Sequence, residues 1–406
     1  MTAPLSGVRV LDVSRFVSGP LCTFFLASLG AEVIAVEAPE PSPSRRLGPF
    51  ALPGGGAAAE MAPGAVAMPF LKRARGKRSV AVDIRAPEGQ DVLRALARRC
   101  DVFVDNSSPG VMARFGLAYD DLVAENAGLV YCAISGYGQG APDRPAMDNI
   151  VQAMSGLMAR TGFPDGPPLR SGITVADHTT AVFAALGVVA ALRGRDATGR
   201  GGLVDVSMLD VLTALVWDEA VDHYAQAGLP VRTGNADARG APINTYRCAD
   251  GWVSVTCTSD VQWERFCRGI GRDDLLARFP DQRARARGAA EIDREIEAWA
   301  SARPAAEVEA AFLAANLPAG RVRDPLEAVE DPAVVARGLM EDLRHPDAPA
   351  DRPSGYRGPR LPILFDGRVP LAPAEPLGAS TDAVLRELAG YGPGALARLR
   401  RAGVIR

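Results

Sequence analysis

The sequence has few cysteines and histidines and no CxxC pair. Its six cysteines are scattered along the chain, and its three histidines are His178, His223 and His345. A structural zinc site needs clustered cysteine and histidine ligands. We therefore expect no bound metal and interpret the cysteines as small core residues.

Long hydrophobic runs and an excess of one charge are missing too. The N-terminal stretch MTAPLSGVRVLDVSRF has neither the charged start nor the apolar centre of a signal peptide. The apolar run after Asp177 meets Arg193 before it is long enough to span a membrane. A net charge of −3 argues against a basic surface for nucleic acid. We expect a cytoplasmic globular protein that binds neither nucleic acid nor membrane.

A glycine-rich dinucleotide fingerprint is also absent. The turn after the first predicted strand reads DVSRFVSGP (12–20), where an NAD-binding protein carries GxGxxG. Glu37 does stand where such proteins bind ribose, but without the glycines an NAD-dependent enzyme is disfavoured.

The first third of the chain does contain a regular alternation of strand and helix patterns. Strands are predicted at 7–14, 31–37, 79–84, 101–105 and 129–135, with helices at 20–30, 87–99 and 118–126. This alternation predicts an α/β fold with a doubly wound, mostly parallel, Rossmann-like sheet that binds ligands at the carboxyl ends of its strands. The Gly-, Ala- and Pro-rich stretch 52–69 interrupts the pattern and is predicted to be a mobile loop.

The length of 406 residues allows two domains. After a long predicted helix at 208–228, the pattern changes to hairpin-like strands and short helices. We therefore assign residues 1–225 to a large domain completed by residues 330–406, and residues 226–329 to a smaller α+β domain. A Pro-rich segment, 345–378, leads to a last helix near Ser380.

A run of cations, KRARGKR (72–78), precedes the third predicted strand. One interpretation is a solvated charge run. The other is a docking surface for a polyanionic small molecule, because lysine and arginine form charge-assisted bonds with phosphates. Arg45, Arg46 and Arg85 would add to such a surface.

Asp177 precedes a stretch, Ala181 to Leu192, that is apolar on almost every side and predicts a buried helix. Asp177 is interpreted either as the N-cap of that helix or as a nucleophile. A carboxylate at a helix N-terminus can stay ionised although it is poorly hydrated, as a nucleophile requires. The residues alone leave both roles open.

Several segments, taken in order, resemble the family III coenzyme A transferases. They include GVRVLDVSRFVSGP, GKRSVAVDIR, DVFVDNSSPGVMARFG, ISGYGQG and VADHTTAVFAALGVVAALRGRDATGRG, and the resemblance extends to LGASTDAVLREL near the C-terminus. It implies transfer of coenzyme A (CoA) from an acyl-CoA to a carboxylic acid through a covalent intermediate on Asp177. CoA esters are then substrates, and no other cofactor is needed. The resemblance further implies an interlocked homodimer.

The resemblance also implies CoA contacts in the loops after the predicted strands: Val17, Ser18, Val82, Asp83, Ile84, Arg85, Asn106, Ser107, Ser108, Arg114, Gly136 and Tyr137. Two positions depart from the family pattern, because Ala38 and Ser135 stand where some members carry basic residues.

Two alternative functions are an α-methylacyl-CoA racemase of the same superfamily and a CoA-binding scaffold without activity. Racemases carry a proton-transferring histidine where this chain has Met147. A thioether takes up no proton at neutral pH, so CoA transfer is favoured. His178, next to Asp177, is the one histidine that could take the place of the racemase histidine.

Overall fold

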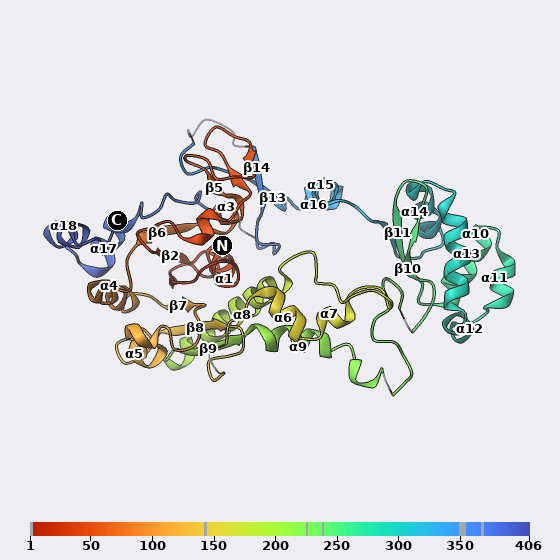
Figure 1. Cartoon of the computed structure of the whole chain (residues 1–406), viewed down its shortest axis with the longest axis horizontal. Coiled ribbons are helices and arrows are strands. Elements are labelled where there is room, and N and C mark those ends of the chain that lie inside the picture. The colour runs from red at the N-terminus through yellow and green to blue at the C-terminus, as the bar shows by residue number, and fades with distance from the viewer. Residues whose placement is uncertain (1–2, 142–143, 225, 238, 349–354, 367–368) are drawn as a thin grey trace. The chain divides into compact units, whose positions relative to one another are not determined.

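A computed structural model of the protein describes residues 3–141, 144–224, 226–237, 239–348, 355–366 and 369–406 (Figure 1). The chain divides into two compact units. The first contains Met1–Ser155, Gly172–Leu215 and Val335–Arg406, and the second contains Gly156–Ser171 and Val216–Val334. The second unit therefore includes 156–171, 216–225 and 330–334, which the sequence analysis assigned to the large domain.

The first unit is built on a six-stranded parallel sheet. Its strands are β1 (Arg9–Asp12), β2 (Glu32–Glu37), β6 (Lys77–Ala81), β7 (Val102–Asp105), β8 (Val130–Ser135) and β9 (Gly202–Ser207). Their spatial order is β6-β2-β1-β7-β8-β9, and all neighbours run parallel. Taken in chain order this is the Rossmann arrangement, so the predicted doubly wound fold is confirmed. The order reverses between β1 and β7, which is where such sheets bind ligands.

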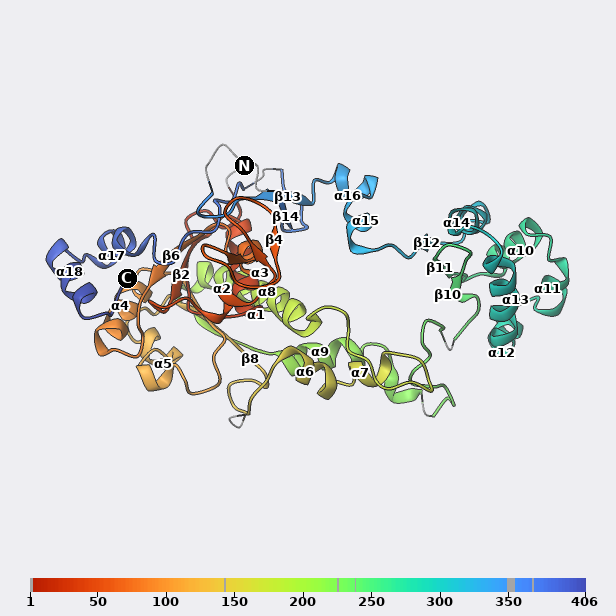
Figure 2. The ribbon, with the colours of Figure 1, turned by 45° about the horizontal axis from the view of Figure 1, so that its top comes forward.

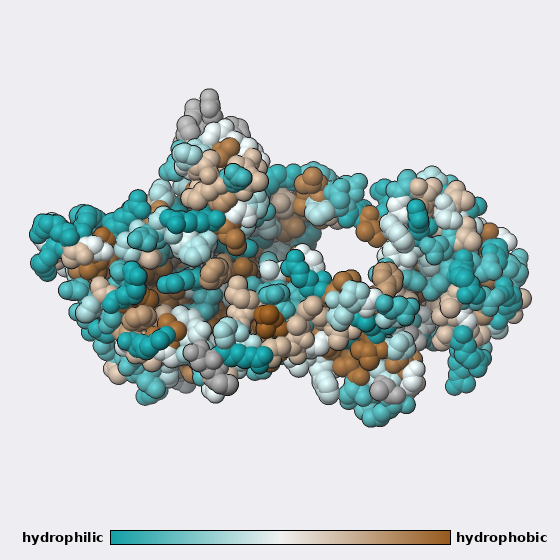
Figure 3. All heavy atoms as spheres, viewed as in Figure 1, coloured by the Kyte–Doolittle hydropathy of each residue, from teal (hydrophilic) through white to brown (hydrophobic). Residues whose placement is uncertain are grey.

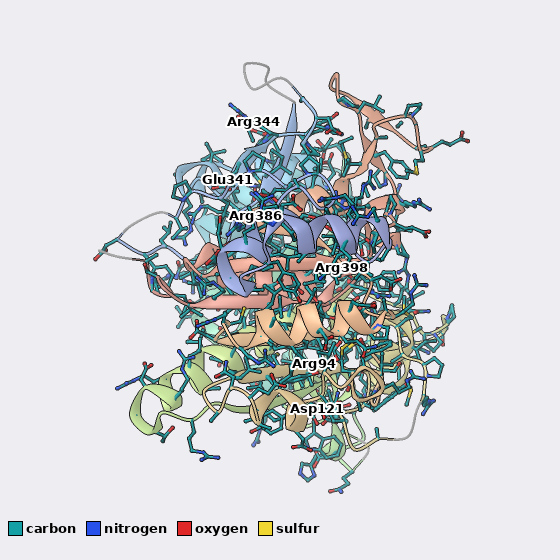
Figure 4. The ribbon with its side chains drawn as sticks, turned by 90° about the vertical axis from the view of Figure 1, so that its left-hand side faces the viewer. Arg94, Asp121, Glu341, Arg344, Arg386 and Arg398 are labelled. Carbon is teal, nitrogen blue, oxygen red and sulfur yellow. The ribbon has the colours of Figure 1, made fainter. Side chains whose placement is uncertain are left out.

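Helices cover both faces of this sheet, because alternate residues of each strand point to opposite sides. Leu11 of β1 belongs to one core cluster and its neighbour Val10 to the other. The Leu11 side is covered by α4 (Pro87–Ala97), α5 (Tyr119–Val123), α17 (Thr381–Ala389) and α18 (Pro393–Arg401). Figure 4 shows these helices in front of the sheet, with Arg94 on α4, Asp121 on α5, Arg386 on α17 and Arg398 on α18.

The Val10 side is covered by α1 (Ser18–Ser28) and α8 (Val175–Thr198). α8 is longer than the predicted apolar stretch and contains Asp177 in its first turn. By length and composition it could cross a membrane, which corrects the sequence prediction that no segment is long enough. Its residues Ala181, Ala184 and Val188 are buried in the core of the unit, and this packing accounts for the apolar character of that side of the helix.

The stretch 52–69 is not loop throughout, as the prediction had it, because it contains two short strands. β3 (Phe50–Ala51) pairs with β4 (Ala57–Ala58) and β5 (Val66–Ala67) in a small antiparallel sheet. The Tyr356 hydroxyl lies 2.8 Å from the Leu52 carbonyl and 2.6 Å from the Gly56 carbonyl. This hydroxyl holds the hairpin against the C-terminal part of the chain.

Tyr356 begins β14 (Tyr356–Pro359), which pairs with β13 (Met340–Leu343). It lies within the predicted Pro-rich segment, of which residues 349–354 and 367–368 are outside the described residues. The last predicted helix is present as α17, one residue after Ser380.

The second unit is a three-stranded antiparallel sheet with helices. β10 (Ile243–Arg247), β11 (Trp252–Thr256) and β12 (Ala319–Arg321) pack on helices that include α10 (Asp260–Gly269), α13 (Ala289–Ser301) and α14 (Ala305–Ala314). Trp263, Phe266 and Phe312 fill its core. The helix predicted over 208–228 is shorter, because α9 (Met208–Trp217) ends before a separate turn at Val221–His223.

Candidate active site

A cavity of about 480 Å³ lies at the carboxyl ends of β1, β2 and β6. Its walls come from the loops that follow these strands, from α2 (Pro43–Arg46) and from α3 (Met68–Arg73). α3 lies beside α1 (Figure 2). The cavity therefore occupies the edge of the sheet where a doubly wound fold holds its ligands.

Several of the residues predicted to contact CoA line this cavity: Val17, Val82, Asp83, Ile84 and Arg85. Arg85 is exposed, and two of its N–H groups donate to the Asp83 carboxylate at 2.8 and 2.9 Å. The guanidinium lowers the pKa of Asp83. The bonds to Asp83 orient the Arg85 guanidinium at the cavity and offset part of its charge.

Asn106 joins the loops that follow β1 and β7. Its side-chain oxygen accepts the Arg15 N–H at 2.8 Å, and its amide donates to the Arg15 carbonyl at 2.7 Å. The same amide lies 3.4 Å from the Ser18 hydroxyl. Gly19 permits this close packing, because a Cβ there would lie 2.2 Å from Cβ of Ser14.

The remaining predicted contacts are not among the residues that line the cavity: Ser18, Asn106, Ser107, Ser108, Arg114, Gly136 and Tyr137. The Ser107 hydroxyl bonds to Asp105 at 2.6 Å, at the end of β7. Ser108 and Arg114 are exposed. The Tyr137 hydroxyl lies 3.4 Å from the Pro145 carbonyl.

Asp177 is in the first turn of α8, but its side chain does not cap the helix. The N-cap residue is Thr174, which makes no side-chain cap. Asp148, the first residue of α6 (Asp148–Met154), performs this role from another element. Its Oδ1 accepts the N–H of Ala176 at 2.8 Å and that of Asp177 at 3.2 Å, and its Oδ2 accepts from Gln152 at 2.6 Å. The N-cap interpretation of Asp177 is therefore wrong.

The surroundings of Asp177 make it a poorly hydrated acid. Burial, followed by the charge of Asp148, raises the pKa of Asp177 to about 6. The charges of His178 and Arg73 and a hydrogen bond from Ser18 act in the opposite direction. At neutral pH the group is mostly ionised while it lacks a full hydration shell, which suits a nucleophile.

His178 is held in one orientation. Its Nδ1 lies 2.7 Å from the Thr174 carbonyl, and because a carbonyl only accepts, Nδ1 carries the hydrogen in the neutral ring. Met147, at the position of the racemase histidine, precedes α6 and is exposed.

The cation run 72–78 is largely used inside the protein. Arg75 pairs with Glu341 at 2.8 Å, and the buried Lys77 pairs with the buried Asp12 at 3.1 Å. Arg78 pairs with carboxylates on β2 and α17. Both interpretations of the run, a solvated surface and a polyanion dock, are wrong for these three cations.

Arg45 is likewise part of the cavity wall rather than an open cation. It is buried, and its guanidinium donates to both oxygens of Glu37 at 2.7 Å. The guanidinium also lies 4.1 Å from the centre of the Phe70 ring. Arg46 is exposed and does not line the cavity.

Two residues near Asp177 were missed by the sequence analysis, Asp148 and Arg73. Arg73 lines the cavity and donates to the Phe16 carbonyl at 3.2 Å. A signal for Asp148 was present, because it directly follows Met147 in the segment that was compared with racemases. Arg73 was hidden among the other cations of 72–78.

The fold and the site define a doubly wound α/β enzyme with a ligand cavity at the carboxyl edge of its sheet. The chain belongs to CoA-transferase family III, whose sequence profile matches residues 5–381. It is a CoA-transferase, and the family resemblance is confirmed.

Characterised relatives and a solved structure agree with this assignment. The chain is 35% identical over 350 residues to the succinyl-CoA–D-citramalate CoA-transferase of Chloroflexus aurantiacus, covering 85% of this chain and 84% of the relative. It is 34% identical over 396 residues to the succinate–glutarate CoA-transferase of Agrobacterium fabrum, covering 95% and 96%. The crystal structure of a CAIB/BAIF family protein from Brucella suis has a TM-score of 0.83 at 30% identity, covering 96% of this chain and all of that one.

Proposed function

We propose that this enzyme moves CoA between a dicarboxylic acyl-CoA and a second dicarboxylic acid, through a covalent intermediate on Asp177. The observation that carries the proposal is the Asp177 carboxylate, which is freed from capping by Asp148 and held with a raised pKa of about 6. The substrate class is supported by the relatives, which act on succinate or succinyl-CoA together with citramalate or glutarate.

The reaction proceeds by exchange of acyl groups and needs no oxidant or metal. The Asp177 carboxylate attacks the thioester carbonyl, the C–S bond breaks, and CoA leaves as a thiolate. The thiolate then attacks the aspartyl carbonyl of the mixed anhydride, which releases the donor acid and leaves an aspartyl-CoA thioester. The acceptor carboxylate repeats these two steps in reverse order and departs as the new CoA ester. Each step is nucleophilic covalent catalysis.

The start of α8 supports this chemistry electrostatically. The positive end of the helix dipole favours the negative charge that develops on the aspartyl carbonyl oxygen. Asp148 holds the first amides of the helix in place. The Ser18 hydroxyl donates a hydrogen bond to Asp177 and orients its carboxylate.

We assign CoA binding to the predicted contacts. Val17, Val82 and Arg85 act directly at the cavity that they line, whereas Asn106 acts by fixing the loop after β1. Ser107, Ser108, Arg114, Gly136 and Tyr137 remain predicted contacts on the strength of the family resemblance. Together they would bind the nucleotide and lead the thioester toward Asp177.

We also propose a homodimer that works in the cytoplasm. Val182, Phe183 and Leu186 of α8 are 53%, 42% and 62% exposed, an apolar surface that a second copy would cover. Figure 3 shows further hydrophobic surface around α6. The six free, buried thiols are typical of a reducing compartment.

The test combines a panel of acyl-CoA donors and carboxylic acids with the variant Asp177→Asn. Wild type should exchange CoA between dicarboxylic acids, read by mass, and should form a hydroxylamine-sensitive adduct on the peptide that contains Asp177. The asparagine variant should bind CoA esters and lose exchange. Exchange by an asparagine variant that mass analysis shows to be free of deamidated protein would overturn the mechanism.

A control separates transfer from racemisation. A 2-methylacyl-CoA is incubated with the enzyme in D₂O without any acceptor acid. Transfer predicts no deuterium at the α-carbon, whereas deuterium uptake would assign the protein to the racemases.

A further inference from the structure

Arg73 differs from the other inward-facing cations of the 72–78 run. Arg75, Lys77 and Arg78 each contact a carboxylate. In the described part of the chain, Arg73 has no carboxylate within the 4.0 Å of an ion pair, and its one hydrogen bond goes to the Phe16 carbonyl at 3.2 Å. A guanidinium has five N–H donors, so most of its binding capacity is unused.

The position of Arg73 puts this capacity at the cavity, within electrostatic range of Asp177. It is the last residue of α3, it is half-buried, and it lines the cavity. Its charge reaches Asp177 and lowers the pKa of that carboxyl, although the two groups form no ion pair. The guanidinium therefore lies beyond salt-bridge distance of the nucleophile, and both groups contact the segment that leads from β1 into α1, Arg73 at Phe16 and Asp177 at Ser18.

We propose that Arg73 binds the second, non-reacting carboxylate of the substrate acid and thereby selects diacids over monoacids. The inference rests on the proposed function of Asp177. An acid that reacts at Asp177 through one carboxyl group would extend its other end toward the Arg73 guanidinium at the cavity wall. A guanidinium binds a carboxylate through two parallel N–H bonds, which makes it selective for such a group.

The other cations of the cavity are less suited to this role. Arg45 is saturated by Glu37, and Lys77 by Asp12. Arg85 is paired with Asp83. Arg15 lines the cavity without an ion pair to a described carboxylate, but it is exposed, which suits a CoA phosphate and makes it a matched control.

Arg73 also has a structural contact that the test must separate from substrate binding. Phe16 has a left-handed backbone, with φ of 65°, and Arg73 holds its carbonyl. Arg73→Gln removes the charge and, because its side chain is shorter, also loses the bond to that carbonyl. Arg73→Lys keeps the charge and loses the two-pronged geometry. If Arg73 had a purely structural role, its substitution would lower kcat/KM equally for all acceptor acids.

The experiment compares succinate with butyrate, and glutarate with pentanoate, as acceptors. In a double-displacement reaction, kcat/KM for the acceptor reports only the second half-reaction, so the donor does not enter. We expect Arg73→Gln to lower the diacid-to-monoacid ratio of kcat/KM by about 10- to 100-fold, the usual effect of losing a charged hydrogen bond. The ratio for Arg73→Lys should lie between those of wild type and Arg73→Gln. Arg15→Met should leave the ratio unchanged.

The possible failures are distinguishable. Equal losses for diacids and monoacids in Arg73→Gln, with wild type active on diacids, would overturn the role of Arg73 and leave the proposed function standing. A wild type that prefers monoacids would overturn both the role of Arg73 and the dicarboxylic substrate class, and would leave only CoA transfer through Asp177 standing. A wild type that exchanges CoA with no acid would overturn both proposals. Thermal unfolding of each variant confirms that it is folded. If Arg73→Gln does not fold, the diacid-to-monoacid ratio of Arg73→Lys is the test.

Discussion

Asp148 accepts the backbone N–H of Asp177 at 3.2 Å, so one carboxylate caps the helix that presents the other. The two acids are placed in different environments. Asp148 is buried and receives N–H bonds from Ala176, Asp177 and Gln152. Asp177 has a hydrogen bond from Ser18, and its pKa is raised to about 6. The first acid therefore performs a structural task with its charge, and the second remains available for reaction.

Variants of Asp148 should separate its charge from its capping role. Asp148→Ala leaves two backbone N–H groups at the start of α8 without an acceptor, and we expect it to lower the free energy of unfolding by about 1–3 kcal/mol. Asp148→Asn keeps an acceptor and removes a negative charge that raises the pKa of Asp177. Its pH–rate profile should shift to lower pH. An unshifted profile in a folded Asp148→Asn enzyme would show that the two acids are not coupled.

The raised pKa of Asp177 predicts how exchange depends on pH. The nucleophile is the ionised form, and its pKa is about 6. We therefore expect kcat/KM to be level above pH 7 and to fall about tenfold for each pH unit well below 6. The measurement is kcat/KM for a CoA ester between pH 4.5 and 8, with stability checked at each pH. A level profile down to pH 5 would contradict a nucleophile with this pKa.

The same pKa predicts an effect on stability. The carboxyl of Asp177 titrates near 6 in the folded protein and near its ordinary value of 3.8 when unfolded. The folded state then binds the proton more tightly, so stability falls as pH rises from about 4 to 6, and the full penalty is present at pH 7. Asp177→Asn should be more stable than wild type by about 1–3 kcal/mol at pH 7, with the gain lost near pH 4. Urea unfolding at both pH values measures this difference.

The architecture could be predicted from sequence because it depends on local patterns. Each central strand is a short apolar run between turn residues, and the helices between strands carry their own start signals. The cation run could not be interpreted in this way. Arg75 pairs with a carboxylate 266 residues away, at Glu341, and Lys77 on β6 pairs with Asp12 on β1, two strands away in the sheet. Whether a cation is free or paired depends on such distant partners.

In the site, too, local sequence predicted some features, whereas others depend on distant residues. The position of Asp177 before an apolar stretch marked it as a candidate, but its capping role was wrong because Asp148, 29 residues earlier, takes that place. The hairpin within 52–69 has the composition of a loop. Its order depends on strand pairing and on Tyr356, 304 residues from Leu52. Contacts of this kind leave no trace in the local sequence.

Two arginines should contribute to CoA affinity more than to chemistry. Arg85 lines the cavity, and Arg114 is an exposed residue assigned by the family resemblance. Replacing either by Ala should raise KM for the CoA ester more than it lowers kcat, and the effect should shrink as salt is added. Arg46→Ala removes an exposed charge that does not line the cavity and is the control. A collapsed kcat at unchanged KM would place the substituted arginine at the reacting centre instead.

The exposed face of α8 predicts the assembly of the enzyme. Leu186 is 62% exposed in the middle of this helix, and an obligate interface of more than about 2,000 Å² would cover it and resist dilution. We expect wild type to be a dimer in light scattering at micromolar concentration. Leu186→Glu places a charge in that interface and should give monomer or unfolded chain, whereas the milder Leu186→Ala should weaken the dimer and keep the fold. Leu313→Glu, which adds the same charge on the exposed side of α14, is the control. A compact wild-type monomer, or a Leu186→Glu variant that remains a tight dimer, would show that this face of α8 is not what joins two copies.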